Sequence, residues 1–71
     1  MRIDIVDRYT LQLYQPYFPG NESYYGAPSS DDWWSMMEWA RMNSIVCRRG
    51  RGTHLIFERD QDVTAFMLRW A

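Results

Sequence analysis

Residues 54–70 read HLIFERDQDVTAFMLRW, and the hydrophobic period changes within them. Leu55 and Phe57 have the period-two spacing of a β-strand. From Asp60 onward the apolar residues recur at the i, i+3, i+4, i+7 spacing of one helix face: Val63, Phe66, Met67 and Trp70. Asp60 is a good N-cap, and Asp62 suits the positive end of the helix dipole. The stretch therefore predicts a strand followed by a C-terminal helix.

The segment before it completes a predicted hairpin over residues 44–58. Ile45 and Cys47 alternate on the first arm, and two glycines fall within Arg49-Gly50-Arg51-Gly52. Such a glycine-containing segment between two alternating runs is typical of a β-hairpin.

A second helix is predicted from Ser29 or Ser30 to about Met42. Either serine is a suitable cap, and Asp31 and Asp32 follow it. One apolar face carries Trp33, Met36, Met37 and Ala40. Trp34 and Met42 lie off that face, and Trp39 lies on its flank. A helix that is apolar nearly all round is either sandwiched or partly engaged by a partner.

The N-terminal part alternates at odd positions across residues 2–14, which predicts β-structure. One long strand is the first interpretation. A hairpin turning at Asp7-Arg8 is the second, because that pair lacks the Gly or Asn that tight turns prefer. Residues 15–30 hold all three prolines and are predicted to be a long loop. Its rings either cap the core or form an aromatic recognition loop: Tyr17, Phe18, Tyr24 and Tyr25.

These elements give an α+β fold in the order β-α-β-β-α, with a small three-stranded sheet and two helices packed on one face. The 71 residues are enough for a single domain, residues 1–71. Twelve aromatic residues exclude a disordered chain. No apolar run is long enough for a transmembrane helix or a signal peptide, so we expect a cytoplasmic protein without membrane contact.

The sequence carries few groups suited to catalysis or metal binding. Cys47 and His54 are the one cysteine and the one histidine, and their opposite parity on the predicted hairpin argues against a catalytic pair. Two such ligands cannot form a structural zinc site. We therefore expect no enzyme activity, no metal and no cofactor.

Arginine and aromatic residues instead indicate a binding surface. The net charge is -1, yet residues 1–40 carry a balance of -4 and residues 41–59 a balance of +4. Arginine forks bind carboxylates and phosphates, and aromatic rings are common at protein interfaces. The predicted partner-binding residues are Arg48, Arg49, Arg51, Tyr17, Phe18, Tyr24, Tyr25, Trp34 and Trp39.

The C-terminal stretch from Phe57 to Trp70 resembles the ending of small bacteriophage proteins, a strand with an aromatic residue followed by Glu-Asp-Ala-x-x-Phe-Lys-Leu-Arg-Trp. The matching residues are Phe57, Asp62, Phe66, Leu68, Arg69 and Trp70. Gln61, Val63 and Met67 depart from the pattern. The resemblance implies a strand–helix unit and a phage source, and by itself no activity. Because small phage proteins of this size without catalytic groups often bind and inhibit a host protein or defence complex, we expect a protein of that kind in the host cytoplasm. The alternatives are a nucleic-acid-binding accessory protein that uses the arginine hairpin and a minor structural subunit. A homodimer is a further possibility for the surplus apolar surface.

Overall fold

In a computed structural model, which describes residues 1–18 and 21–71, the described residues form five strands and two helices. Of residues 16–18 and 21–25 the structure describes the backbone alone. The elements are β1 (Arg2–Asp7), β2 (Thr10–Phe18), β3 (Asn21–Gly26), α1 (Ser30–Met42), β4 (Cys47–Arg49), β5 (His54–Phe57) and α2 (Asp60–Trp70). The α+β class, the hairpin of β4 and β5 and both helices are confirmed.

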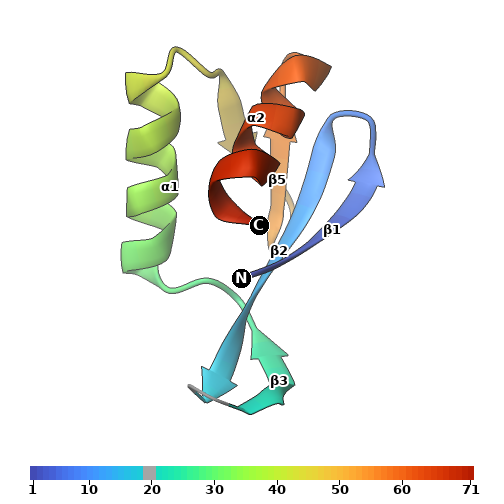
Figure 1. Cartoon of the computed structure of the whole chain (residues 1–71), viewed down its shortest axis with the longest axis vertical. Coiled ribbons are helices and arrows are strands. Elements are labelled where there is room, and N and C mark those ends of the chain that lie inside the picture. The colour runs from blue at the N-terminus through green and yellow to red at the C-terminus, as the bar shows by residue number, and fades with distance from the viewer. Residues whose placement is uncertain (19–20) are drawn as a thin grey trace.

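The sheet is antiparallel, with β2 at the centre of its pairings. The strand order is β1-β2-β5-β4, and β3 pairs with the far end of β2. Near its start, β2 pairs with β1 on one side and with β5 on the other, and the pairing with β3 begins at Gln15. Figure 1 shows the β2–β3 hairpin extending away from the helices.

The single long strand predicted for residues 2–14 is wrong, and the hairpin alternative is right. The Asp7 carboxylate accepts a hydrogen bond from the Tyr9 backbone N–H at 2.9 Å, so an aspartate stabilises the turn that a glycine or asparagine was expected to make. The same hydrogen bond lowers the pKa of Asp7. The register shifts between Ile5 and Asp7, which keeps Ile3 and Ile5 on the same face as Leu13 and Leu11.

The predicted loop over residues 15–30 and the predicted three-stranded sheet are also corrected. The segment contains the end of β2, all of β3 and the start of α1. Pro16 lies in the part of β2 that pairs with β3 alone, because the pairing of β2 with β1 ends at Tyr14 and its pairing with β5 ends at Gln12. A proline there interrupts neither of these two ladders. The register of β2 and β3 shifts between Pro16 and Phe18.

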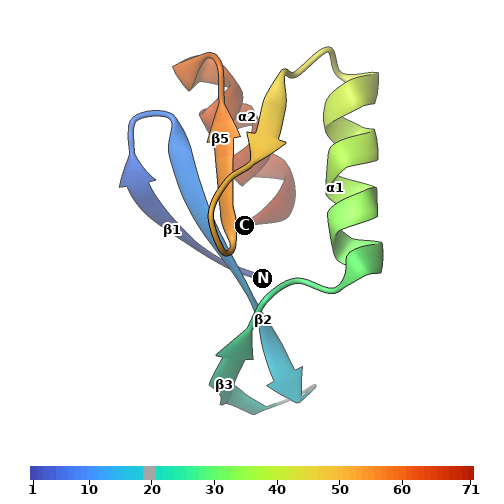
Figure 2. The ribbon, with the colours of Figure 1, turned by 180° about the vertical axis from the view of Figure 1, so that it is seen from behind.

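The hydrophobic core lies between the odd-numbered face of the sheet and both helices. Phe66 is fully buried and makes edge contacts with Phe57 and Trp39, at centroid distances of 5.5 and 6.0 Å. The buried apolar residues are Leu11, Leu13, Trp33, Met36, Ala40, Ile45, Leu55, Phe57, Val63 and Phe66. Trp70, which lies on the predicted apolar face of the C-terminal helix, is partly buried and packs against the core from the end of α2. Figure 2 shows the opposite face of the sheet, which neither helix covers.

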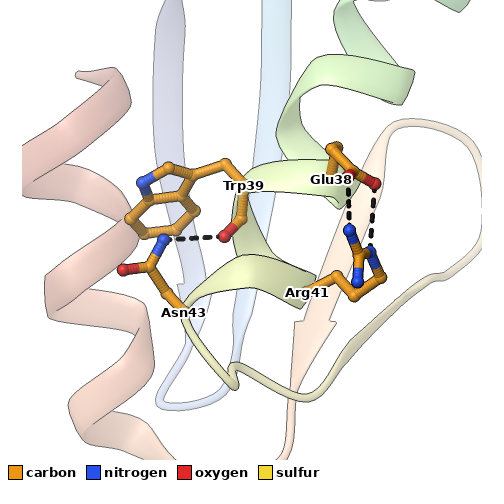
Figure 3. Close-up of polar contacts among 4 residues, drawn as sticks. All are labelled: Glu38, Trp39, Arg41 and Asn43. Carbon is orange, nitrogen blue, oxygen red and sulfur yellow. Dashed lines mark hydrogen bonds and ion pairs between the residues drawn. The ribbon is translucent and has the colours of Figure 1, made fainter.

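Side chains stabilise both ends of α1. Ser29 is the N-cap, with its hydroxyl accepting from the Asp32 N–H and its own N–H donating to the Asp32 carboxylate. At the other end the Asn43 side chain donates to the Trp39 carbonyl at 2.8 Å (Figure 3). Arg41 donates to both carboxylate oxygens of Glu38, which lowers the pKa of Glu38.

The start of α2 differs in one detail from the prediction. Asp60 is the first helical residue, and the N-cap is Arg59, which provides no side-chain cap. Arg59 instead donates to the buried carboxylate of Asp62 at 3.2 Å. Within the described residues neither helix is long and apolar enough to cross a membrane.

Candidate functional site

The β4–β5 hairpin turns one row of side chains away from the helices. Arg48 is opposite Ile56 in the register, and the Glu58 N–H donates to the Val46 carbonyl at 3.1 Å. Because Leu55 and Phe57 point into the core, the even-numbered residues between and beyond them point outward. We call the outward set Val46, Arg48, Ile56 and Glu58 the hairpin surface.

A depression of about 290 Å³ lies at the hairpin surface. Its lining consists of Val46, Cys47, Arg48, Ile56, Phe57 and Glu58. A second hollow, lined by Ser44, Val46, Glu58 and Arg59, adjoins it through its two shared residues. Val46 is 61% exposed, so its apolar side chain stands in solvent beside the depression. The arrangement is an apolar recess bordered by one cation and one anion.

The arginines of the molecule divide into paired and unpaired groups. Arg2, Arg8, Arg41 and Arg59 each form an ion pair with a carboxylate. No carboxylate among the described residues pairs with Arg48, Arg49 or Arg51, the three cations of the hairpin. The same holds for Arg69 of α2, which lies over the Trp70 ring. The positive charge predicted for the hairpin is therefore not neutralised by ion pairs to residues that the structure describes.

The three hairpin arginines differ in what they can offer a partner. Arg48 borders the depression. Arg49 lies over the Trp33 ring at 4.2 Å, because its odd parity directs it to the helix side. Arg51 is exposed in the turn beside Gly52, at the opposite end of the hairpin from the depression. The predicted arginine cluster is thus spread over two faces and the turn.

Cys47 and His54 do not form a catalytic pair in this geometry. Cys47 is opposite Phe57 and faces the helix side, whereas His54 belongs to the outward-facing row. Burial raises the pKa of the Cys47 thiol, and the charge of Asp62 raises it further. A raised pKa disfavours the thiolate, which is the nucleophilic form. The described residues contain no group of three or more metal-ligating side chains.

The aromatic residues predicted for partner binding have different placements. Trp34 is 69% exposed on the outer side of α1. Trp39 makes edge contacts with Phe66 and Trp70, which gives it a packing role between the helices. Tyr17, Phe18, Tyr24 and Tyr25 belong to β2 and β3, but their side chains lie outside the described residues.

Sequence reasoning missed the apolar part of the hairpin surface. Val46 and Ile56 occupy positions where an alternating half-buried hairpin normally carries polar residues. That exception to the alternation was the available signal.

The chain matches no protein-family model, and no significant match is found among curated proteins or solved structures.

Proposed function

We propose that this protein is a non-catalytic modulator that binds a partner protein through the hairpin surface. The observation that carries the proposal is the apolar depression beside exposed Val46, bordered by Arg48, with which no carboxylate of the described residues pairs. Protein interfaces commonly have an apolar core surrounded by a polar, solvent-accessible rim.

The chemistry of the hairpin surface favours a partner whose contact surface has an apolar side chain next to a carboxylate. Val46 and Ile56 offer aliphatic contact area, and Arg48 can donate two parallel hydrogen bonds to one carboxylate. Arginine is also enriched among the residues that dominate binding energy. Glu58 at the same rim restricts how the partner can be oriented, because it repels a partner carboxylate placed beside it.

The partner that we propose is a protein or defence complex of a bacterial host. The reason is the resemblance of the C-terminal stretch to small bacteriophage proteins, in which residues such as Phe66 and Trp70 match. Binding would inhibit the partner by occupying its surface.

The test is affinity capture from host lysate with a tagged chain and three variants. We expect one host protein at near-stoichiometric yield, and we expect Arg48→Glu and Val46→Lys to lose it. Leu68→Lys is the matched control, because Leu68 is even more exposed than Val46 but lies on α2. Equal capture by all four chains, or capture of nucleic acid alone, would contradict the proposal.

Nucleic-acid binding is the second candidate, and it is favoured because no carboxylate in the described part of the chain forms an ion pair with Arg48, Arg49 or Arg51. Binding to phosphates weakens with salt in proportion to the number of contacts. We expect each Arg→Ala change at these positions to reduce the salt slope for a short single-stranded RNA by about one. An absence of binding at low salt excludes this candidate.

A further inference from the structure

The outer edge of β1 carries unpaired backbone groups. In the described part of the chain β1 pairs with β2 alone, and Figures 1 and 2 show no element beyond its outer edge. Leu13 N–H donates to the Thr53 carbonyl and Phe57 N–H to the Tyr9 carbonyl, so the odd residues of β2 bond toward β5. The backbone groups of the even-numbered residues of β2 therefore bond toward β1.

The same alternation determines which backbone N–H and C=O groups of β1 point away from β2, toward the outer edge of the sheet. Arg2 and Asp4 are opposite Tyr14 and Gln12, so their backbone groups bond to β2. The N–H and C=O groups of Ile3 and Ile5 consequently point to the free edge. An edge of this kind is a template for another strand.

We propose that a second copy of this chain pairs with this edge, antiparallel, with Ile3 opposite Ile3 of the second copy. In this register Arg2 lies opposite Asp4 of the second copy, and the reverse pair forms by symmetry. The two charged pairs lie on the uncovered face of the sheet, where Arg2 already contacts its own Asp4 at 3.4 Å. Each guanidinium would then lie between two carboxylates.

The charges select this register among those that the backbone permits. Outward-facing groups bond only when odd residues stand opposite odd residues. Placing Ile3 opposite Ile5 would put Asp4 opposite Asp4 of the second copy, and like charges directly opposite are destabilising. Placing Ile5 opposite Ile5 would carry the pairing into the irregularity between Ile5 and Asp7, where the ladder is disrupted.

Apolar side chains near the edge of β1 also favour pairing with a second copy of the chain. Ile5 is 66% exposed and lines a groove of about 380 Å³ between β1 and α2, together with Val63 and Met67. In the proposed register Ile5 faces Met1 of the second copy, which would cover part of that exposed side chain. A two-fold pairing of identical edges closes on itself, so assembly stops at two copies.

This dimer is independent of the proposed function, because the hairpin surface lies at β4 and β5, at the other end of the strand order. The experiment measures molar mass by light scattering and sedimentation from micromolar to millimolar concentration. The variants are Arg2→Asp, Asp4→Arg and the double exchange, with Arg51→Glu as the control for a changed net charge.

We expect a monomer–dimer equilibrium for the native chain. Each single reversal should raise the dissociation constant about tenfold or more, because two cross-strand attractions become repulsions. The double exchange should restore the dimer, since complementary pairs form again, and Arg51→Glu should leave it unchanged. Far-UV circular dichroism verifies that each variant is folded.

A covalent test reads the register directly. In a Cys47→Ser background, an Arg2→Cys chain mixed with an Asp4→Cys chain should form a mixed disulfide on mild oxidation by oxygen, which takes two protons and two electrons from the thiols and is reduced to hydrogen peroxide. Directly opposite residues of this kind lie about 4.5 Å apart at Cα, within disulfide range. A native chain that stays monomeric at millimolar concentration overturns the proposal, as does a double exchange that fails to recover or an assembly larger than two copies.

Discussion

The guanidinium of Arg49 lies 4.2 Å from the centre of the Trp33 ring and connects the β4–β5 hairpin to the first turn of α1. Because Arg49 is exposed, we expect Arg49→Ala to lower the free energy of unfolding by about 0.5–1 kcal/mol. Urea denaturation measures the change. Arg51→Ala is the control, since Arg51 is exposed in the turn, and equal effects of both changes would argue against the ring contact as the cause.

The N-cap of α1 gives a test with a matched neighbour. Ser29→Ala removes the hydroxyl that accepts from the Asp32 N–H, and we expect a loss of about 1 kcal/mol of stability. Ser30→Ala changes the first helical residue instead and should have little effect or a small stabilising one, because alanine is the better helix former. Thermal or urea unfolding followed by circular dichroism compares the two, and the reverse order would assign the cap to Ser30.

Gly52 tests backbone strain separately from packing. Its φ is +61°, and no heavy atom beyond its own two chain neighbours lies within 4 Å of the place where a Cβ would stand. Gly52→Ala should therefore cost about 1 kcal/mol through the left-handed conformation alone. Gly52→Asn should cost less, because asparagine adopts this conformation more readily. Urea midpoints of the two variants measure the difference, and equal losses would point to a cause other than backbone conformation.

The Cys47 thiol should react slowly with a thiol-specific reagent in the folded protein. Burial raises its pKa, so at neutral pH less thiolate is present than in the unfolded chain. The rate should rise as the pH approaches the raised pKa, and it should rise at fixed pH when denaturant unfolds the chain. A folded-state rate equal to that of a free cysteine peptide at every pH would contradict this.

The parts of the fold that the sequence predicted are those set by strong periodicity. The apolar spacing of Trp33, Met36 and Ala40 and that of Val63 and Phe66 placed both helices, and the structure buries all five residues. The alternation around Gly50 and Gly52 placed β4 and β5. Here the local preference and the buried face agree, which makes such segments predictable.

The turn between β1 and β2 could not be predicted with the same rules, because the Asp7 side chain replaces the usual glycine or asparagine geometry. The candidate site was predicted only in part. Arg48 borders the depression, as predicted for a binding residue, but the guanidinium of its neighbour Arg49 lies over the Trp33 ring. That contact joins residues far apart in the sequence, so no local sequence pattern predicts it.

The position of β5 has a consequence for how the chain acquires its structure during synthesis. β5 is made late but lies between β2 and β4, and its Leu55 and Phe57 complete the core with Val63 and Phe66 of α2. A nascent chain that ends before residue 54 holds β1, β2 and α1 without the strand that joins them to β4. Folding therefore waits for the C-terminal third to leave the ribosome, and a chain cut between β4 and β5 should regain structure only when both fragments are mixed.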